Sequence, residues 1–151
     1  MATVKELVFL ETNGSCAHCG IRDNRVLTIH HIDRSDPTDE SYDNKLLLCH
    51  NCHQCHHQEK GPTTDELREI KRRLIIGTLT RPGLNALKEA YRRSMVVAMP
   101  FLVNHLVEFG YLEYVDWISS NESEEGDQVI TQAQYKISPN GKQLLEKWNL
   151  K

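Results

Sequence analysis

The segment from Cys49 to His57 carries three cysteines and four histidines within nine residues. Thiolate sulfur and imidazole nitrogen are the ligands that zinc and other transition metals prefer in proteins. Core packing does not require such a density of these side chains in a polar segment, and short tracts rich in cysteine and histidine are typical of metal binding. The sequence therefore predicts that this segment takes part in a metal site.

Four of the five cysteines form two Cys-x-x-Cys pairs, Cys16 with Cys19 and Cys49 with Cys52. Two such pairs supply the four thiolates of a tetrahedral site, which suits structural zinc. Gly20 follows the first pair and relieves its tight turn sterically. The 29 residues between Cys19 and Cys49 exceed the usual spacing of a zinc ribbon, so we expect an inserted element between the pairs.

The residues between the cysteine pairs predict a strand and then a loop. Residues 25–33 contain β-branched and aliphatic residues that favour an extended backbone, and His30 and His31 lie near the end of this segment. Successive strand residues point to opposite faces, so the two histidines should do different jobs unless the strand bends there. Residues 34–42 have the composition of a loop, and residues 45–48 predict a short buried strand or turn before the second cysteine pair.

A helix is expected from Cys52 onward. On this helix His53 and His57 are four residues apart, a spacing that places both imidazoles on one face. The expected helix therefore presents a second pair of histidines directly after the second cysteine pair.

The order of these residues resembles a known family. His30 and His31, then Asn44 and then His53, are similar to the His-Asn-His signature of the HNH nucleases, which have the ββα-metal or His-Me finger fold. The two Cys-x-x-Cys pairs around them resemble the zinc-containing branch of that family. The resemblance covers residues 16–57. The double histidine and the His-x-x-x-His pair also resemble the nuclease colicins, which lack the zinc knuckles.

The resemblance implies a role for each matching residue. His31 matches the general base that activates the attacking water, and Asn44 matches the asparagine that braces the loop and so orients the base. The implied ligands of the catalytic metal are His30, His53 and, as in colicin-like members, His57, with His56 as an alternative to His57.

The implied chemistry is sensible for hydrolysis of a phosphodiester. A histidine with an ordinary pKa of about 6.5 can take a proton from water at neutral pH. One divalent cation can stabilise both the phosphorane and the leaving oxygen. A site made only of histidines favours zinc, nickel or manganese, whereas magnesium remains an option if carboxylate or water completes the ligand shell.

A basic segment follows the cysteine and histidine region. Residues 60–93 carry nine Lys or Arg and four Asp or Glu, a net charge of +5 in a chain of net charge −3. A helix is expected from Asp65 to about Gly77, with its apolar residues on one face. Its basic residues Lys71, Arg72 and Arg73 are candidates for contact with a phosphate backbone. The alternative is an ordinary solvated helix face.

The C-terminal part predicts helices over residues 84–91 and 94–108, strands over 111–118 and 129–137, and a last helix ending near Trp148. This order, and the sequence Tyr-Lys-Ile-Ser-Pro-Asn-Gly-Lys before the last helix, resemble winged-helix regulators. Four acidic residues at the expected hairpin tip would be repelled by DNA phosphates. We therefore expect this part to form a homodimer or dock to a protein partner rather than to read DNA.

The expected fold class is α+β. Residues 1–60 should form a zinc-stapled, treble-clef-like ββα-metal HNH domain, and residues 61–151 a helical linker with a mainly helical winged-helix-like domain. We expect a DNA endonuclease with a structural zinc and one catalytic Mg²⁺, Mn²⁺, Ni²⁺ or Zn²⁺. The alternatives are a zinc-stabilised DNA-binding regulator with inert histidines, and a nuclease subunit whose partner selects the target.

The composition agrees with an ordinary globular protein, with 39% hydrophobic and 26% charged residues. The N-terminal residues lack the apolar core of a secretory signal, and no apolar run approaches the roughly 18 residues of a membrane helix. A cytoplasmic protein with reduced thiols is therefore expected, and clustered cysteines in such a protein bind metal rather than pair.

Overall fold

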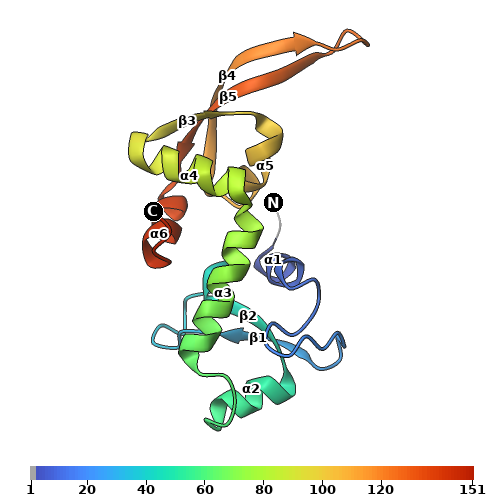
Figure 1. The fold of residues 1–151 in the computed structure, drawn as a ribbon, viewed down its shortest axis with the longest axis vertical. Helices are drawn as coiled ribbons and strands as arrows, with labels where there is room; N and C mark the ends of the chain where they lie inside the picture. Colours follow the sequence, from blue (N-terminus) through green and yellow to red (C-terminus); the bar gives the residue numbers. More distant parts are fainter. Residues whose placement is uncertain (1–2) are drawn as a thin grey trace. The chain divides into compact units, whose positions relative to one another are not determined.

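The computed structural model describes residues 3–151, which form an α+β protein of two compact units (Figure 1). The first unit comprises residues 3–78 and the second residues 79–151. The described residues contain six α-helices and two small antiparallel sheets. The predicted α+β class is thus confirmed at this level.

The first unit is built around a two-stranded hairpin and the helix that follows it. Strands β1 and β2 pair antiparallel with His31 opposite Lys45 and Leu27 opposite Cys49. Cys49 then caps the helix, because its sulfur accepts a hydrogen bond from the backbone N–H of Cys52. The elements of this unit are α1 (Val4–Glu11), β1 (Leu27–His31), a 3₁₀ turn η1 (Tyr42–Asn44), β2 (Lys45–Cys49), α2 (His50–His57) and α3 (Thr64–Leu79).

Helix α3 packs against this hairpin region. Its Leu67 is fully buried in one cluster with Ile32, Leu46 and Leu48. The apolar face of an amphipathic helix is stabilised by burial, and here the hairpin supplies the surface. The boundary was predicted at residue 60, but the two compact units divide between Thr78 and Leu79.

The second unit is a three-stranded antiparallel sheet with helices. The strand order is β3-β5-β4, and the buried residues of the unit include Leu87, Leu106, Tyr135 and Leu145. Its elements are α4 (Arg81–Arg93), β3 (Met95–Ala98), α5 (Pro100–Glu108), β4 (Leu112–Glu122), β5 (Gln128–Ile137) and α6 (Pro139–Lys147).

The helix predicted over residues 94–108 is wrong in its first part. Residues Met95–Ala98 form strand β3, in which Val96 pairs with Tyr135 of β5. β-branched residues favour strands, and a residue before proline is driven to an extended backbone. Pro100 therefore marks the start of α5, where its missing N–H costs no hydrogen bond.

The outer part of the β4–β5 hairpin is a two-stranded arm. Strand β3 pairs only with residues 133–136 of β5, whereas β4 and β5 remain paired as far as Glu122 and Gln128. Figure 1 shows this hairpin extending past β3 within the second unit. We define the arm as residues 115–130.

Candidate metal centres

The four paired cysteines converge on one point of the first unit. All are free thiols, and their sulfur atoms lie within 4.8 Å of one another. The sulfurs of Cys19 and Cys49 are 3.7 Å apart. A tetrahedral zinc site with Zn–S distances of about 2.3 Å places its sulfurs about 3.8 Å apart. The four-cysteine cluster therefore fits a structural zinc ion.

Backbone contacts hold the first cysteine pair against the hairpin. The N–H of Ala17 donates to the carbonyl of Leu47 in β2 over 2.8 Å, and the N–H of Gly20 closes the turn onto the carbonyl of Cys16 over 2.9 Å. Gly20 has a φ of +79°, which glycine adopts without steric cost. The turn is thereby fixed in place beside the second cysteine pair.

The backbone also favours the thiolate of Cys16. Burial of this thiol opposes ionisation, but the backbone N–H groups of Cys19, Cys49 and His18 outweigh it and lower the pKa of Cys16 to about 7. Zinc binds the thiolate, so these N–H groups favour Cys16 as a ligand, whereas burial and the neighbouring thiols raise the pKa of Cys52.

A second cluster brings together three histidines, His30 of β1 with His53 and His57 of α2. One ring nitrogen from each lies within 4.8 Å of the other two. The Nε2 atoms of His53 and His57 are 3.0 Å apart, and the ring centres of His30 and His53 are 4.9 Å apart. The strand and the helix thus place three imidazoles at one point.

His30 is the buried member of this cluster. Its side chain is 1% exposed, and neither ring nitrogen has a hydrogen-bond partner among the described residues. Burial first, and then the charges of His53, His56 and Arg34 among its neighbours, lower the pKa of His30 to about 3. The imidazole is therefore neutral at pH 7. Buried polar atoms without partners are uncommon, and a metal ion would give one of these nitrogens its partner.

The structure separates His57 from His56. The ring centres of His56 and His57 lie 5.0 and 5.6 Å from that of His30. One ring nitrogen of His57 lies within the cluster, whereas Nδ1 of His56 donates to the carbonyl of Pro62 over 2.6 Å. Arg34 reaches the edge of the cluster, where its Nη2 donates to Nε2 of His57 over 2.6 Å, so a metal ion bound at this nitrogen would displace Arg34 from its single lone pair. The geometry therefore favours His57 as the third candidate ligand. No pattern in the sequence marks Arg34, because its contact with His57 of α2 depends on the fold.

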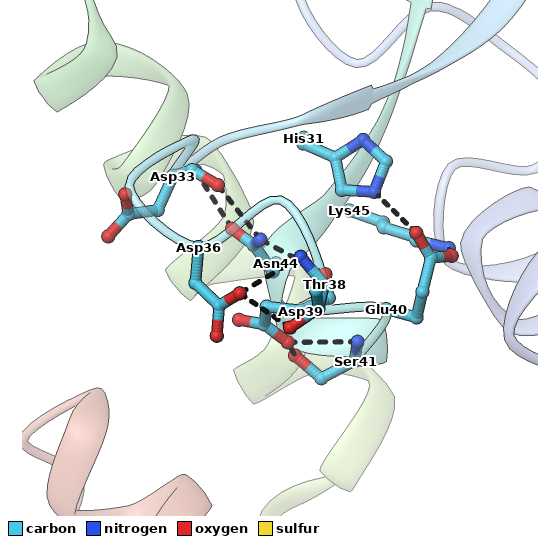
Figure 2. Close-up of polar contacts among 9 residues, drawn as sticks. All are labelled: His31, Asp33, Asp36, Thr38, Asp39, Glu40, Ser41, Asn44 and Lys45. Carbon is cyan, nitrogen blue, oxygen red and sulfur yellow. Dashed lines mark hydrogen bonds and ion pairs between the residues drawn. The ribbon is translucent and has the colours of Figure 1, made fainter.

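Asn44 lies buried beneath the loop that follows β1. Its Oδ1 accepts the N–H of Asp33 over 2.8 Å, and its Nδ2 donates to the carbonyls of Asp33 over 3.0 Å and Asp39 over 3.3 Å (Figure 2). One amide thus joins the two ends of the loop.

His31 lies beside this loop, with about a third of its side chain exposed. Its Nε2 is 3.1 Å from Oε1 of Glu40, and the other oxygen of Glu40 accepts from Nζ of Lys45 (Figure 2). No sequence pattern singled out Glu40 or Lys45, because their meeting with His31 depends on the path of the loop.

The structure corrects one predicted nucleic-acid contact. Lys71 is fully buried, and its Nζ donates to both carboxylate oxygens of Glu11 at 2.7 and 2.9 Å. It also lies 3.6 Å from the ring centre of Tyr42. The prediction that Lys71 contacts a phosphate backbone is wrong, because an ammonium buried in this way does not reach a ligand on the surface.

The two arginines beside Lys71 have different surroundings. Arg73 is exposed and pairs with Glu69 over 3.1 Å, and Arg72 is half-buried. Both can be tested as phosphate contacts.

Comparison with known proteins gives no match, whether with family models, curated proteins or solved structures. Within residues 3–151, no helix has the length and apolar character that crossing a membrane requires.

Proposed function

We propose that this chain is a metal-dependent HNH endonuclease that hydrolyses DNA phosphodiester bonds. In this proposal, β1, β2 and α2 form the ββα-metal unit, and the four cysteines hold its structural zinc in a treble-clef-like arrangement. The observation that carries the proposal is His30, a buried imidazole without hydrogen-bond partners that faces two further histidines. An isolated structural histidine would be expected to have a partner.

In this account His30, His53 and His57 would hold the catalytic divalent metal. When bound there, the metal supplies charge stabilisation for the phosphorane and for the leaving 3′ oxygen. The histidine donors fit Zn²⁺, Ni²⁺ or Mn²⁺, and Mg²⁺ fits where oxygen ligands complete the shell.

His31 acts as the general base. Its ring, about a third exposed, takes a proton from the water that attacks phosphorus, a step for which histidine is the most common general base in enzymes. Asn44 keeps the adjoining loop in place. Arg34, Arg72 and Arg73 are the proposed contacts to phosphate oxygens, since a guanidinium binds phosphate in a bidentate manner.

The experiment that tests this proposal is cleavage of supercoiled plasmid by zinc-loaded protein with added Mg²⁺, Mn²⁺ or Ni²⁺. We expect metal-dependent nicking by the wild type, a loss of at least about a hundredfold in His31→Ala, and retained activity in His50→Ala. His50 is a matched control because it is an exposed histidine of α2 outside the candidate cluster. Equal nicking by wild type and His31→Ala would contradict the assignment of the base.

A second candidate function is supported by the second unit. The arm exposes large apolar side chains, each between 40% and 51% accessible: Trp117, Ile118, Val129 and Ile130. Exposed apolar patches commonly mark protein interaction sites. We propose that this winged-helix-like unit forms a homodimer or docks to a protein partner, which would make the chain a nuclease subunit or a zinc-stabilised DNA-binding regulator.

The DNA-binding regulator and the nuclease subunit would give different results in the plasmid assay. A regulator binds DNA equally well as wild type and as His31→Ala, and neither protein nicks the plasmid. A subunit nicks weakly alone and gains activity with its partner.

A further inference from the structure

Glu40 links two side chains that face each other across the hairpin. His31 of β1 and Lys45 of β2 are directly paired in the antiparallel register. One oxygen of the Glu40 carboxylate lies 3.1 Å from Nε2 of His31, and the other accepts from Nζ of Lys45 (Figure 2). The carboxylate therefore has a separate partner for each oxygen, and the contact with Lys45 favours the orientation in which it faces the imidazole.

The backbone that carries Glu40 is held although its side chain is 65% exposed. The carbonyl of Asp39 accepts from Nδ2 of buried Asn44, and the N–H of Glu40 donates to the carbonyl of Thr38 over 2.9 Å. Side chains within the loop also hydrogen-bond to its backbone. For example, Oδ1 of Asp36 accepts the N–H of Thr38 over 2.9 Å. The bracing by Asn44 thus reaches the residue next to Glu40.

We infer that Glu40 is a positioning residue for His31: it accepts the Nε2–H of the imidazole and thereby leaves Nδ1 free to take a proton from the attacking water. This inference rests on the proposed nuclease function. A neutral imidazole carries one N–H, and the hydrogen bond made by one ring nitrogen decides which nitrogen acts as the base. Lys45 holds the carboxylate in place, and Asn44 acts on the base through the loop.

The proton and electron balance of the step is simple. Nδ1 of His31 accepts a proton from water, and the oxygen lone pair of that water forms the new bond to phosphorus. The bond from phosphorus to the leaving oxygen breaks with its electron pair, and that oxygen takes a proton from solvent. Glu40 keeps its own charge throughout and faces the imidazolium that forms.

Kinetics of zinc-loaded protein with a divalent metal and duplex DNA test the inference, with Glu40→Ala, Glu40→Gln and Glu6→Gln compared with wild type. Glu6 is the matched control, an exposed glutamate of the same unit, and glutamine can keep its capping contact with Thr3. We expect kcat to fall about tenfold to a hundredfold in Glu40→Ala. The fall should be smaller in Glu40→Gln, whose amide oxygen still accepts from Nε2–H, and absent in Glu6→Gln.

The value of KM separates positioning from a general effect of charge. Removing an acidic group near bound DNA lowers KM equally in Glu40→Ala and Glu40→Gln, because both lose the same charge. If Glu40 positions His31, kcat should instead decrease from wild type to Glu40→Gln and decrease further in Glu40→Ala. A kcat in Glu40→Ala within twofold of wild type would overturn the inference.

Nitrogen NMR of the histidine rings at pH 8 gives a readout that does not depend on cleavage. His31, assigned by the signal that is lost in His31→Gln, should be the Nε2–H tautomer in wild type and shift toward Nδ1–H in Glu40→Ala. If wild type does not cleave DNA, the proposed function fails, and the tautomer alone decides whether Glu40 positions the ring. An unchanged tautomer in Glu40→Ala overturns the positioning role.

Discussion

The two units of this chain differ in the types of side chain that they bury and expose. In the first unit, three of the four paired cysteines, His30 and Lys71 are buried together with a small set of leucines. In the second unit the buried residues are mostly aliphatic and aromatic, while the arm leaves large apolar side chains exposed. All five cysteines and seven of the eight histidines belong to residues 1–78.

In the first unit, buried thiols, one imidazole and a paired lysine take up part of the interior beside its leucines. We therefore expect its folding to depend on a bound metal and on the ion pair of Lys71 with Glu11. The second unit has an apolar core of its own and should fold without either.

Removing zinc should unfold the first unit and leave the second folded. Structural zinc contributes on the order of 10 kcal/mol in small zinc domains. Both tryptophans, Trp117 and Trp148, lie in the second unit, so their fluorescence reports on that unit. We expect a chelator, or Cys49→Ser, to reduce far-UV circular dichroism while the tryptophan emission stays native. Cys55→Ser is the control, because Cys55 lies outside the four-cysteine cluster. Joint loss of both signals would show that the units do not differ in this way.

Breaking the buried ion pair should lower the free energy of unfolding by less than zinc removal does, but still by several kcal/mol. Lys71→Met leaves the carboxylate of Glu11 buried without its cation, and such changes destabilise by about 3–5 kcal/mol. The double variant Lys71→Met with Glu11→Gln removes both charges and keeps an oxygen for the hydroxyl of Tyr42, which donates to Glu11 over 2.5 Å. In urea unfolding of zinc-loaded protein we expect the double variant to regain most of the loss. A double variant as unstable as the single one would argue against an isolated buried charge as the cause.

The burial of His30 should make the first unit sensitive to mild acid. Burial and the neighbouring histidines lower the pKa of His30 to about 3, against about 6.5 in an unfolded chain. Between these values the unfolded state binds one proton more than the folded state. The free energy of unfolding should therefore fall as the pH falls below about 6.5, by at most about 1.4 kcal/mol per pH unit.

The measurement is urea unfolding at pH 7.0 and 5.5, with zinc on the cysteines and no other metal added. The free energy of unfolding that is lost between the two pH values should be smaller in His30→Gln than in wild type. Groups that titrate in both proteins contribute equally, so the difference between the proteins reports on His30. Equal losses in both would mean that His30 does not titrate on unfolding.

Changing the arm should have the smallest effect on stability but a clear effect on association. Trp117 and Ile118 are about half exposed, so Trp117→Ser with Ile118→Ser should alter the free energy of unfolding by less than about 1 kcal/mol. Sedimentation of wild type should show a dimer that this variant lacks. Leu10→Ser is the control, because Leu10 is an exposed apolar residue of the first unit. A monomeric wild type would leave docking to another protein as the role of the arm.

Sequence patterns predicted the local parts of this structure better than the parts that depend on tertiary contacts. Each Cys-x-x-Cys pair is a local pattern, and the presence of two such pairs predicted the four-thiolate cluster although 29 residues separate them. The β-branched residues before His30 predicted β1, because strand propensity is also local. The burial of Lys71 was not predictable, since it depends on Glu11 and Tyr42 from elements distant in the sequence. The apolar run that became β3 does not distinguish strand from helix by its periodicity. Glu40 meets His31 only because the intervening loop folds back over Asn44.

The proposed function requires that the three histidines hold a metal ion separate from the zinc of the cysteines. A calorimetric titration of Ni²⁺ or Mn²⁺ into protein that already carries one zinc measures this binding. We expect one further binding site per chain in wild type and in His50→Ala, and loss of that site in His53→Ala with the zinc retained. Binding that is equally strong in His53→Ala, or no binding to wild type, would show that the histidines do not form a metal site.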